Sequence, residues 1–234
     1  MLQQSFYIVA ILLVSVYACK KDNVHATENS YQDYNHYSFL ALGDSYTIGQ
    51  SVAEDERFPA QTQALLKATG KQVDKLTYIA ATGWTTSDLQ NAIDEQKPTP
   101  PFNIVTLLIG VNDQSQFHDT SGYSERFTRL VENAIVLTGN KSNRVFVLSI
   151  PDYSVTPLGS VDDTMMIRKR IDLFNSINHR IVVTYSVNYT DITTVSKEAL
   201  HEPSLIASDS LHFSGKMYRK WAELLVPEIR EVLK

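Results

Sequence analysis

The 234-residue sequence carries 21 Lys and Arg against 26 Asp and Glu, and its formal net charge of −5 disfavours a nucleic-acid binder, because no positive field attracts phosphates. Hydrophobic residues make up 43% and aromatic residues 10%, which excludes a disordered chain, and the length suits one domain. The single cysteine excludes an internal disulfide and a cysteine-based zinc site.

The N-terminus is interpreted as a signal peptide that ends before the single cysteine. Met1–Ala18 contains no charged side chain, and Phe6–Ala18 is an apolar run. As a helix this run would span about 20 Å, short of a bilayer core of about 30 Å. Val16-Tyr17-Ala18-Cys19 is similar to a bacterial lipobox, which implies that Cys19 is lipidated and becomes the first residue of the mature protein. An uncleaved membrane anchor and an ordinary secretory signal are the alternatives.

Lys20–His36 has almost no aliphatic side chains and no helical or strand periodicity, which is typical of a solvated tether. The chain is therefore divided into a lipoprotein signal peptide (1–18), a flexible tether (19–36) and a folded body (37–234). Each buried CH₂ contributes about 0.8 kcal/mol, so two or three acyl chains on Cys19 suffice for a stable anchor. We expect an extracytoplasmic, membrane-anchored lipoprotein on the periplasmic or cell-surface side, and a monomer.

The body alternates short β-branched or aliphatic runs with segments of helical periodicity, which predicts βα units on a parallel sheet. Five strands are predicted, at Ser38–Leu42, Lys75–Ala80, Ile104–Ile109, Arg144–Ile150 and Tyr189–Thr193. Helices are predicted at Pro59–Thr69, Thr86–Gln96, Ser124–Thr138, Met165–Tyr185 and from Gly215 to Leu233. Thr86 and Asp88 are the expected capping residues of the second helix. Such sheets bind ligands beyond the carboxyl ends of their strands, so the site is expected in the loops that follow.

Three of those loops carry polar or small residues suited to one chemistry. Gly43-Asp44-Ser45 follows the first strand, Gly83 the second and Gly110-Val111-Asn112-Asp113 the third. Near the C-terminus, Asp209-Ser210-Leu211-His212 places a histidine three residues after an aspartate. A serine hydroxyl becomes a nucleophile when an imidazole takes its proton and a third group orients that imidazole. If these pieces converge, they predict a serine hydrolase.

In this order, the motifs resemble the blocks of the GDSL or SGNH family of serine esterases and lipases. The resemblance implies that Ser45 is the nucleophile, His212 the general base and Asp209 its orienting partner. It also implies an oxyanion hole made by Ser45, Gly83 and Asn112. The implied fold is a three-layer α/β/α sandwich, flavodoxin-like, with a five-stranded parallel sheet, and the implied reaction needs no metal or organic cofactor. Tyr46 replaces the family's leucine and is expected to change the pocket lining or local packing rather than the triad.

Several alternatives stay open at this stage. Asp44, Asp113 and Asp209 with His212 could instead bind a metal, although no histidine pair at ligand spacing accompanies them. The same acyl-serine could serve an acyltransferase, or the fold could be an inactive ligand-binding lipoprotein. The resemblance spans lysophospholipids, thioesters, aryl esters and acetylated polysaccharides, and small esters or glycan esters are slightly favoured. Trp84 and the loop Pro151–Ser154 are candidate pocket walls, with a place in the core or in a turn as the equal alternative, and His118 is interpreted as solvated.

Overall fold

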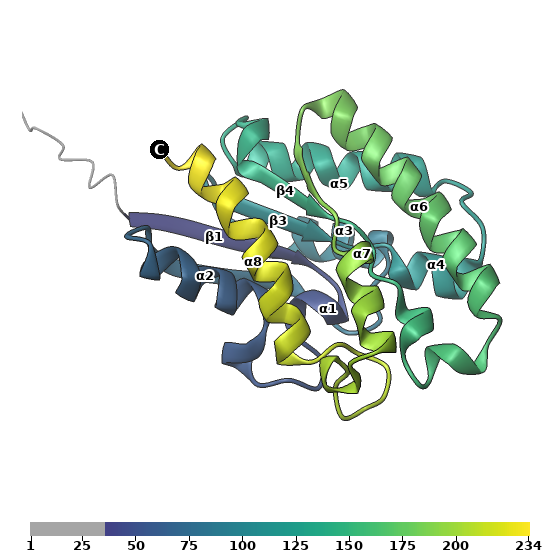
Figure 1. Cartoon of the computed structure of the whole chain (residues 1–234). Coiled ribbons are helices and arrows are strands. Elements are labelled where there is room, and N and C mark those ends of the chain that lie inside the picture. Colours follow the sequence, from purple (N-terminus) through teal and green to yellow (C-terminus); the bar gives the residue numbers. More distant parts are fainter. Residues whose placement is uncertain (1–35) are drawn as a thin grey trace, which may run out of the picture. The chain divides into compact units, whose positions relative to one another are not determined.

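The computed structural model describes residues 36–234 (Figure 1). The predicted signal peptide, Cys19 and all but the last residue of the predicted tether lie outside the described residues, so the lipid anchor stays a prediction. His36, the last residue assigned to the tether, is the first residue of strand β1 (His36–Gly43) and pairs with Gln72. None of the helices in residues 36–234 is long and apolar enough to cross a membrane.

All five predicted strands are present and form one parallel sheet, with ends that differ from the prediction by up to three residues. After β1 come β2 (Gln72–Ala80), β3 (Ile104–Leu108), β4 (Val145–Leu148) and β5 (Asn188–Thr190). Their order is β2-β1-β3-β4-β5, the flavodoxin-like order. From β1 the chain adds β2 on one side of the sheet and then β3, β4 and β5 on the other. The loops after β1 and β3 therefore flank the crevice at this topological switch point, where such folds bind ligands.

Helices cover both faces of the sheet, which explains why every residue of β3 and β4 is buried. Helices α2 (Phe58–Ala68) and α8 (Gly215–Val232) pack together over one face, and α3 (Thr86–Gln96), α5 (Tyr123–Leu137) and α6 (Thr164–Tyr185) form the other layer (Figure 1). All five long helices agree with the prediction to within one residue at each end. The predicted three-layer α/β/α architecture is confirmed.

Most of the elements that were not predicted are short helices. A helix of three to seven residues is too short for its sequence to show a helical periodicity. Three are α-helices, namely α1 (Ser45–Ile48), α4 (Val111–Phe117) and α7 (Thr193–Ser196). The 3₁₀-helices are η1 (Glu54–Glu56), η2 (Ser142–Arg144), η3 (Tyr153–Val155), η4 (Gly159–Val161), η5 (Lys197–Leu200) and η6 (Pro203–Leu205). Thr193, which was predicted to end the fifth strand, instead begins α7.

The predicted cap of α3 was wrong by one residue. Thr85 is the N-cap: its hydroxyl accepts from the Asp88 N–H at 3.4 Å, and Asp88 Oδ2 accepts from the Thr85 N–H at 2.9 Å. This reciprocal pair is a capping box. Thr86 is the first helical residue, and its hydroxyl is free to donate to Asp113 at 2.6 Å. Helix α3, which follows β2, is thereby tied to helix α4, which follows β3.

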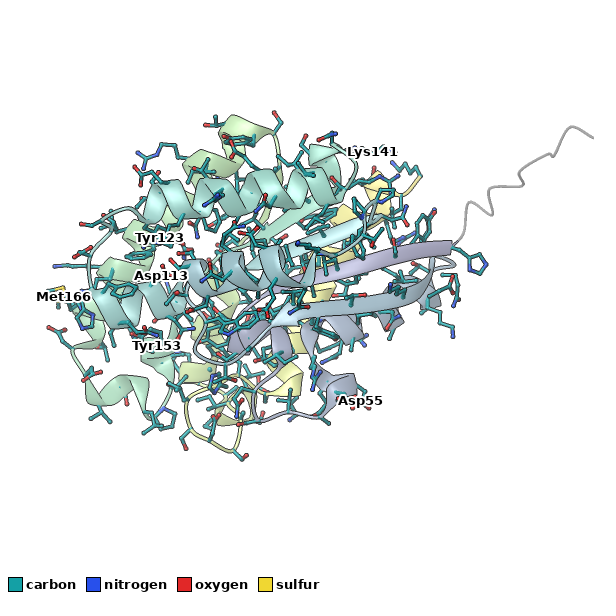
Figure 2. All side chains as sticks on the ribbon, turned by 180° about the vertical axis from the view of Figure 1, so that it is seen from behind. Asp55, Asp113, Tyr123, Lys141, Tyr153 and Met166 are labelled. Atoms are coloured by element: carbon teal, nitrogen blue, oxygen red, sulfur yellow. The ribbon has the colours of Figure 1, made fainter. Side chains whose placement is uncertain are left out.

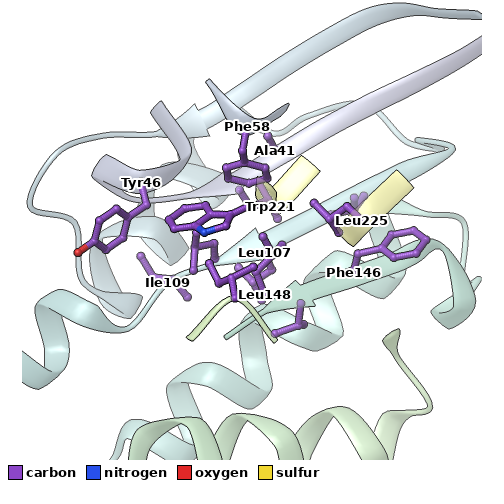
Figure 3. Close-up of a cluster of buried hydrophobic side chains, with 14 of the residues drawn as sticks. Ala41, Tyr46, Phe58, Leu107, Ile109, Phe146, Leu148, Trp221 and Leu225 are labelled. Atoms are coloured by element: carbon purple, nitrogen blue, oxygen red, sulfur yellow. The ribbon is translucent and has the colours of Figure 1, made fainter. Parts of the chain in front are cut away.

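An aromatic cluster holds the start of α1 against α8. Trp221 is fully buried, with its ring edge-on to Tyr46 at 6.0 Å and tilted against Phe58 at 6.2 Å. Figure 3 shows these three rings beside aliphatic side chains of the sheet, among them Leu107. Large aromatic side chains bury the most apolar area per residue and dominate core energetics. The backbone beside Ser45 is therefore anchored to a buried aromatic cluster of the core.

Candidate active site

Ser45 is positioned by the turn from β1 into α1. A Cβ on Gly43 would collide with the Leu108 carbonyl oxygen, so only glycine allows β1 and β3 to approach this closely before the turn. Asp44 caps α1, and its Oδ1 accepts from the Tyr46 N–H at 3.0 Å. Ser45 is then the first helical residue, and the described residues offer its hydroxyl no hydrogen-bond partner. The hydroxyl is thus available to a base or a substrate.

Ser45, Asn112 and His212 line one pocket with a volume of about 490 Å³. This is within the range of about 300–1,000 Å³ that is typical of small-molecule sites. Ser45 and Asn112 lie in the first turns of α1 and α4, which directly follow β1 and β3, and His212 lies in the segment before α8, as expected for the carboxyl edge of the sheet. Figure 2 shows Asp113, Tyr153 and Met166 toward this same end of the strands. The structure therefore brings together three residues that lie far apart in the sequence.

His212 is held by Asp209 within one short turn. The imidazole Nδ1 lies 2.7 Å from Asp209 Oδ2, while Oδ1 accepts from the backbone N–H groups of Leu211 at 3.0 Å and His212 at 2.9 Å. Partial burial acts to raise the pKa of Asp209, but hydrogen bonds from the Ser51 hydroxyl, these two N–H groups and the imidazole together hold it well below its ordinary value. An ionised carboxylate only accepts, so the proton lies on Nδ1 and Nε2 remains as an acceptor.

Asn112 is clamped to the loop that follows β2. Its Nδ2 donates to the Trp84 carbonyl at 2.9 Å, and Gln116 Nε2 donates to the Gly83 carbonyl at 3.4 Å. Gly110, at φ +121°, redirects the chain from β3 into α4, and a Cβ there would collide with the Tyr123 hydroxyl. Glycine is therefore required where the chain turns toward Asn112.

Gly83 and Trp84 are placed differently from Asn112. Gly83 is exposed with φ +83° and is not among the residues that line the pocket, although its loop borders Asn112. Trp84 does not line the pocket either, so of its two expected placements the structure has the core and not the pocket wall. Its ring is partly buried against the core. Trp84 contributes its carbonyl oxygen to the site instead of its side chain.

The loop after β4 and the end of α4 supply pocket residues that sequence reasoning found only in part. Tyr153 lines the pocket, as the hypothesis for Pro151–Ser154 proposed, and its hydroxyl donates to Gln114 Oε1 at 3.0 Å. His118 caps the unpredicted helix α4 and also lines the pocket, which was not predicted, while its side chain is exposed to solvent as expected. Its Nδ1 lies 3.2 Å from Arg170 Nη1. Arg170, on α6, carries no local motif that could have signalled a place in the pocket.

The carboxylates considered as metal ligands have other partners. Asp113 is buried and accepts from the Thr86 N–H at 2.8 Å and from Arg126 Nη2 at 3.3 Å. Asp209 is hydrogen-bonded to the His212 imidazole, and Asp44 caps the N-terminus of α1. Within residues 36–234, no three His, Cys, Asp or Glu side chains are grouped to hold a metal ion. The geometry therefore gives these groups structural or orienting partners within the protein.

Asp44 is fully buried beside the candidate nucleophile. Burial raises the pKa of its carboxyl from 3.8 to about 8, because the hydrogen bond from the Tyr46 N–H only partly offsets desolvation and Asp113 adds a second negative charge nearby. The Oδ2 atom has no hydrogen-bond partner among the described side chains and backbone. Asp44 is therefore a neutral carboxylic acid at pH 7.

The raised pKa predicts that wild-type stability falls as pH rises from about 4 to about 8. In this window the folded protein keeps the Asp44 proton and the unfolded chain has lost it, so the Asp44 contribution lowers the free energy of unfolding by up to about 1.4 kcal/mol per pH unit. Asp44→Asn removes this titration. Its free energy of unfolding relative to wild type should rise with pH in urea titrations between about pH 5 and pH 8. Parallel pH profiles for the two proteins would contradict the raised pKa.

Sequence comparison agrees with the arrangement of the site. Residues 41–220, from within β1 to within α8, match a single family model. The chain belongs to the GDSL-like lipase/acylhydrolase family. As a GDSL-like acylhydrolase, the protein is an enzyme of a family that acts on esters. The family expectation that was drawn from four short motifs is therefore confirmed.

Solved structures share the fold of this GDSL-like acylhydrolase at low sequence identity. A lipase/acylhydrolase from Enterococcus faecalis is 19% identical, with a TM-score of 0.60 over 83% of this chain and 96% of the other. The acetylxylan esterase Axe2 from Geobacillus stearothermophilus is 20% identical, with a TM-score of 0.63 over 82% and 94%. A lipase from a goat rumen metagenome is 20% identical, with a TM-score of 0.65 over 82% and 97%. No curated protein sequence matches this chain.

Tyr46 occupies the position of the leucine for which the GDSL-like family is named. The side chain is 3% exposed and lines the pocket. Its ring is edge-on to His212 at 5.7 Å and to Trp221 at 6.0 Å. Tyr46 thus belongs both to the pocket lining and to the core packing, and its ring also contacts His212 of the expected triad.

Proposed function

We propose that this acylhydrolase is a serine esterase that cleaves carboxylic esters through an acyl-Ser45 intermediate. The observation that carries the proposal is the arrangement of Ser45 and His212 in one pocket, with the imidazole Nδ1 bonded to an ionised Asp209. A base oriented in this way has its second nitrogen available for the serine proton. Membership of the acylhydrolase family supports the same reaction class.

In the first half-reaction, His212 Nε2 takes the Ser45 hydroxyl proton while Oγ attacks the ester carbonyl carbon. The tetrahedral intermediate collapses, the carbon–oxygen bond to the alcohol breaks, and His212 returns the proton to the leaving alkoxide. In the second half-reaction, His212 takes a proton from water as the water oxygen attacks the acyl-serine carbon. Collapse then releases the carboxylic acid, and the proton returns to Ser45.

The oxyanion of each tetrahedral intermediate requires hydrogen-bond donors that are already in place. We assign this role to the backbone N–H groups of Ser45 and Gly83 and to the Asn112 side-chain amide. Neither N–H has an acceptor among the backbone bonds of the described residues. One proton of the Asn112 amide is used by the Trp84 carbonyl, so the second is available to the substrate.

For the substrate, we propose a short-chain acyl ester of a polar, hydroxyl-bearing alcohol such as a sugar. Beyond Ser45 and His212, the pocket wall carries the charged side chains of Asp162, Asp163 and Arg170. Carboxylates accept from hydroxyl groups and a guanidinium donates to them, whereas a long alkyl chain would take water from these charges without offering hydrogen bonds in return. The fold shared with an acetylxylan esterase is in line with this substrate class.

A chain-length series tests both parts of the proposal. Initial rates on p-nitrophenyl esters should be highest with the acetyl ester and should fall steadily toward the palmitoyl ester. Acetate release from acetylated xylo-oligosaccharides, measured in parallel, should exceed fatty-acid release from a lysophospholipid. A maximum at long chains would contradict the substrate class, and the absence of hydrolysis of every ester would contradict the function itself.

A further inference from the structure

The carboxylate that orients His212 has a fourth hydrogen-bond donor outside its own turn. Ser51 Oγ donates to Asp209 Oδ2 at 2.6 Å, and the same oxygen lies 2.7 Å from His212 Nδ1. Ser51 lies in the loop after α1 and is separated from Asp209 by 158 positions in the sequence. This donor belongs to none of the motif blocks that led to the candidate site.

The other three donors to Asp209 cannot fix its position relative to Ser45. They are the two backbone N–H groups and the imidazole of the Asp209–His212 turn, so they would move together with that turn. Among the hydrogen bonds of the described residues, only the one from Ser51 joins the carboxylate to the segment that carries the nucleophile. A bond to a charged acceptor is stronger than one between neutral groups.

The loop that contains Ser51 is itself attached to the neighbouring catalytic loop. Thr82 Oγ1 donates to Gln50 Oε1 at 2.7 Å, and Thr82 directly precedes Gly83. Gln50 and Ser51 therefore connect the loops after β1 and β2 with the turn before α8. Ser51 adopts the left-handed conformation at φ +66°, which residues with a Cβ rarely adopt. Glycine would fit this backbone more easily.

We propose that Ser51 is a positioning residue of the active site, which fixes the Asp209 carboxylate, and through it the His212 imidazole, relative to Ser45. The inference rests on the proposed esterase function and deepens it. Ser51 does not line the pocket and so does not touch the substrate. Its effect is on the alignment of the base during proton transfer, where small displacements are costly.

Kinetics of two Ser51 variants distinguish the effect of losing the hydroxyl from the effect of the strained backbone conformation. Ser51→Ala and Ser51→Gly both remove the donor, but glycine also suits φ +66°. With p-nitrophenyl acetate, kcat should fall about tenfold in both variants, as expected for one hydrogen bond to a charged group, while KM stays unchanged. Thermal unfolding should show that both variants remain folded at the assay temperature, with at most the small loss of stability that removal of one exposed hydrogen bond to a charged group causes. A wild-type kcat in both variants, or in the glycine variant alone, would overturn the proposal.

Ser210→Ala is the matched control. Ser210 is the same residue type, adjoins Asp209 and has φ +65°, and no hydrogen bond of its hydroxyl occurs among the described residues. This variant should keep the wild-type kcat. A tenfold loss in Ser210→Ala as well would show that any change near Asp209 has this effect and would overturn the specific role of Ser51.

A spectroscopic readout keeps this inference separate from the proposed function. The downfield proton resonance of His212 Nδ1–H, bonded to Asp209, reports the geometry of that bond without any substrate. It should shift in Ser51→Ala and Ser51→Gly and stay in place in Ser210→Ala. If the resonance shifts but the wild type hydrolyses no ester, the proposed function fails and the positioning role stands. An unshifted resonance in both Ser51 variants would refute the positioning role even in an active esterase.

Discussion

Replacing Ser45 with alanine is expected to lower kcat for p-nitrophenyl acetate by roughly 10⁶-fold, the size of loss that follows removal of the serine of a comparable triad. The variant keeps the pocket, the oriented imidazole and the oxyanion donors but has no oxygen to form the acyl intermediate. Because the Ser45 hydroxyl has no hydrogen-bond partner among the described residues, its removal should leave thermal unfolding close to wild type. A loss of rate without a loss of stability identifies a chemical role.

A fluorophosphonate probe provides an independent measurement of the same prediction. Wild type should gain one covalent adduct, located at Ser45 by peptide mass spectrometry, and Ser45→Ala should gain none. Ser115→Ala is the appropriate comparison, since Ser115 is another serine that lines the pocket and its hydroxyl donates to the Asn112 carbonyl at 3.4 Å. That variant should still be labelled at Ser45. Equal hydrolysis by wild type and Ser45→Ala would refute the acyl-serine mechanism.

The sheet and the long helices could be predicted because burial imposes patterns that are local in the sequence. Strand β3 is covered on both faces and is apolar at every position except Thr106, while α5 alternates buried and exposed positions with a helical period. Helix α4, with the sequence VNDQSQF, has too few apolar residues to show a period. Its existence depends on the turn at Gly110 and on packing, and for this reason the place of His118 in the pocket was missed.

The contacts of the candidate site also separate into those that are local in the sequence and those that are not. The contact between Asp209 and His212 could be anticipated because three residues of spacing in one turn bring the two side chains together. The contacts of Ser51 with Asp209, and of Arg170 with His118, join segments that meet only after the sheet has formed. No local pattern encodes such contacts, so they require the tertiary structure. The lipid anchor at Cys19 depends on a segment outside the described residues and stays a prediction from the sequence.

Asn112→Ala is the second substitution with a large expected effect. Loss of one oxyanion donor typically lowers kcat about 10²- to 10³-fold, because the missing bond is made mainly in the transition state. We therefore expect a decrease of this size with p-nitrophenyl acetate and little change in KM. The same amide also donates to the Trp84 carbonyl, so the substitution removes a structural clamp together with a catalytic donor.

Gln116→Ala separates these two contributions. Gln116 clamps the same loop through the Gly83 carbonyl at 3.4 Å, but it does not line the pocket. If Asn112 acts on the oxyanion, Gln116→Ala should change kcat less than threefold, the scale of a weak, exposed hydrogen bond of about 0.5 kcal/mol. If the two substitutions instead lower kcat by similar small factors, Asn112 is a clamp only, and the oxyanion depends on the backbone N–H groups of Ser45 and Gly83.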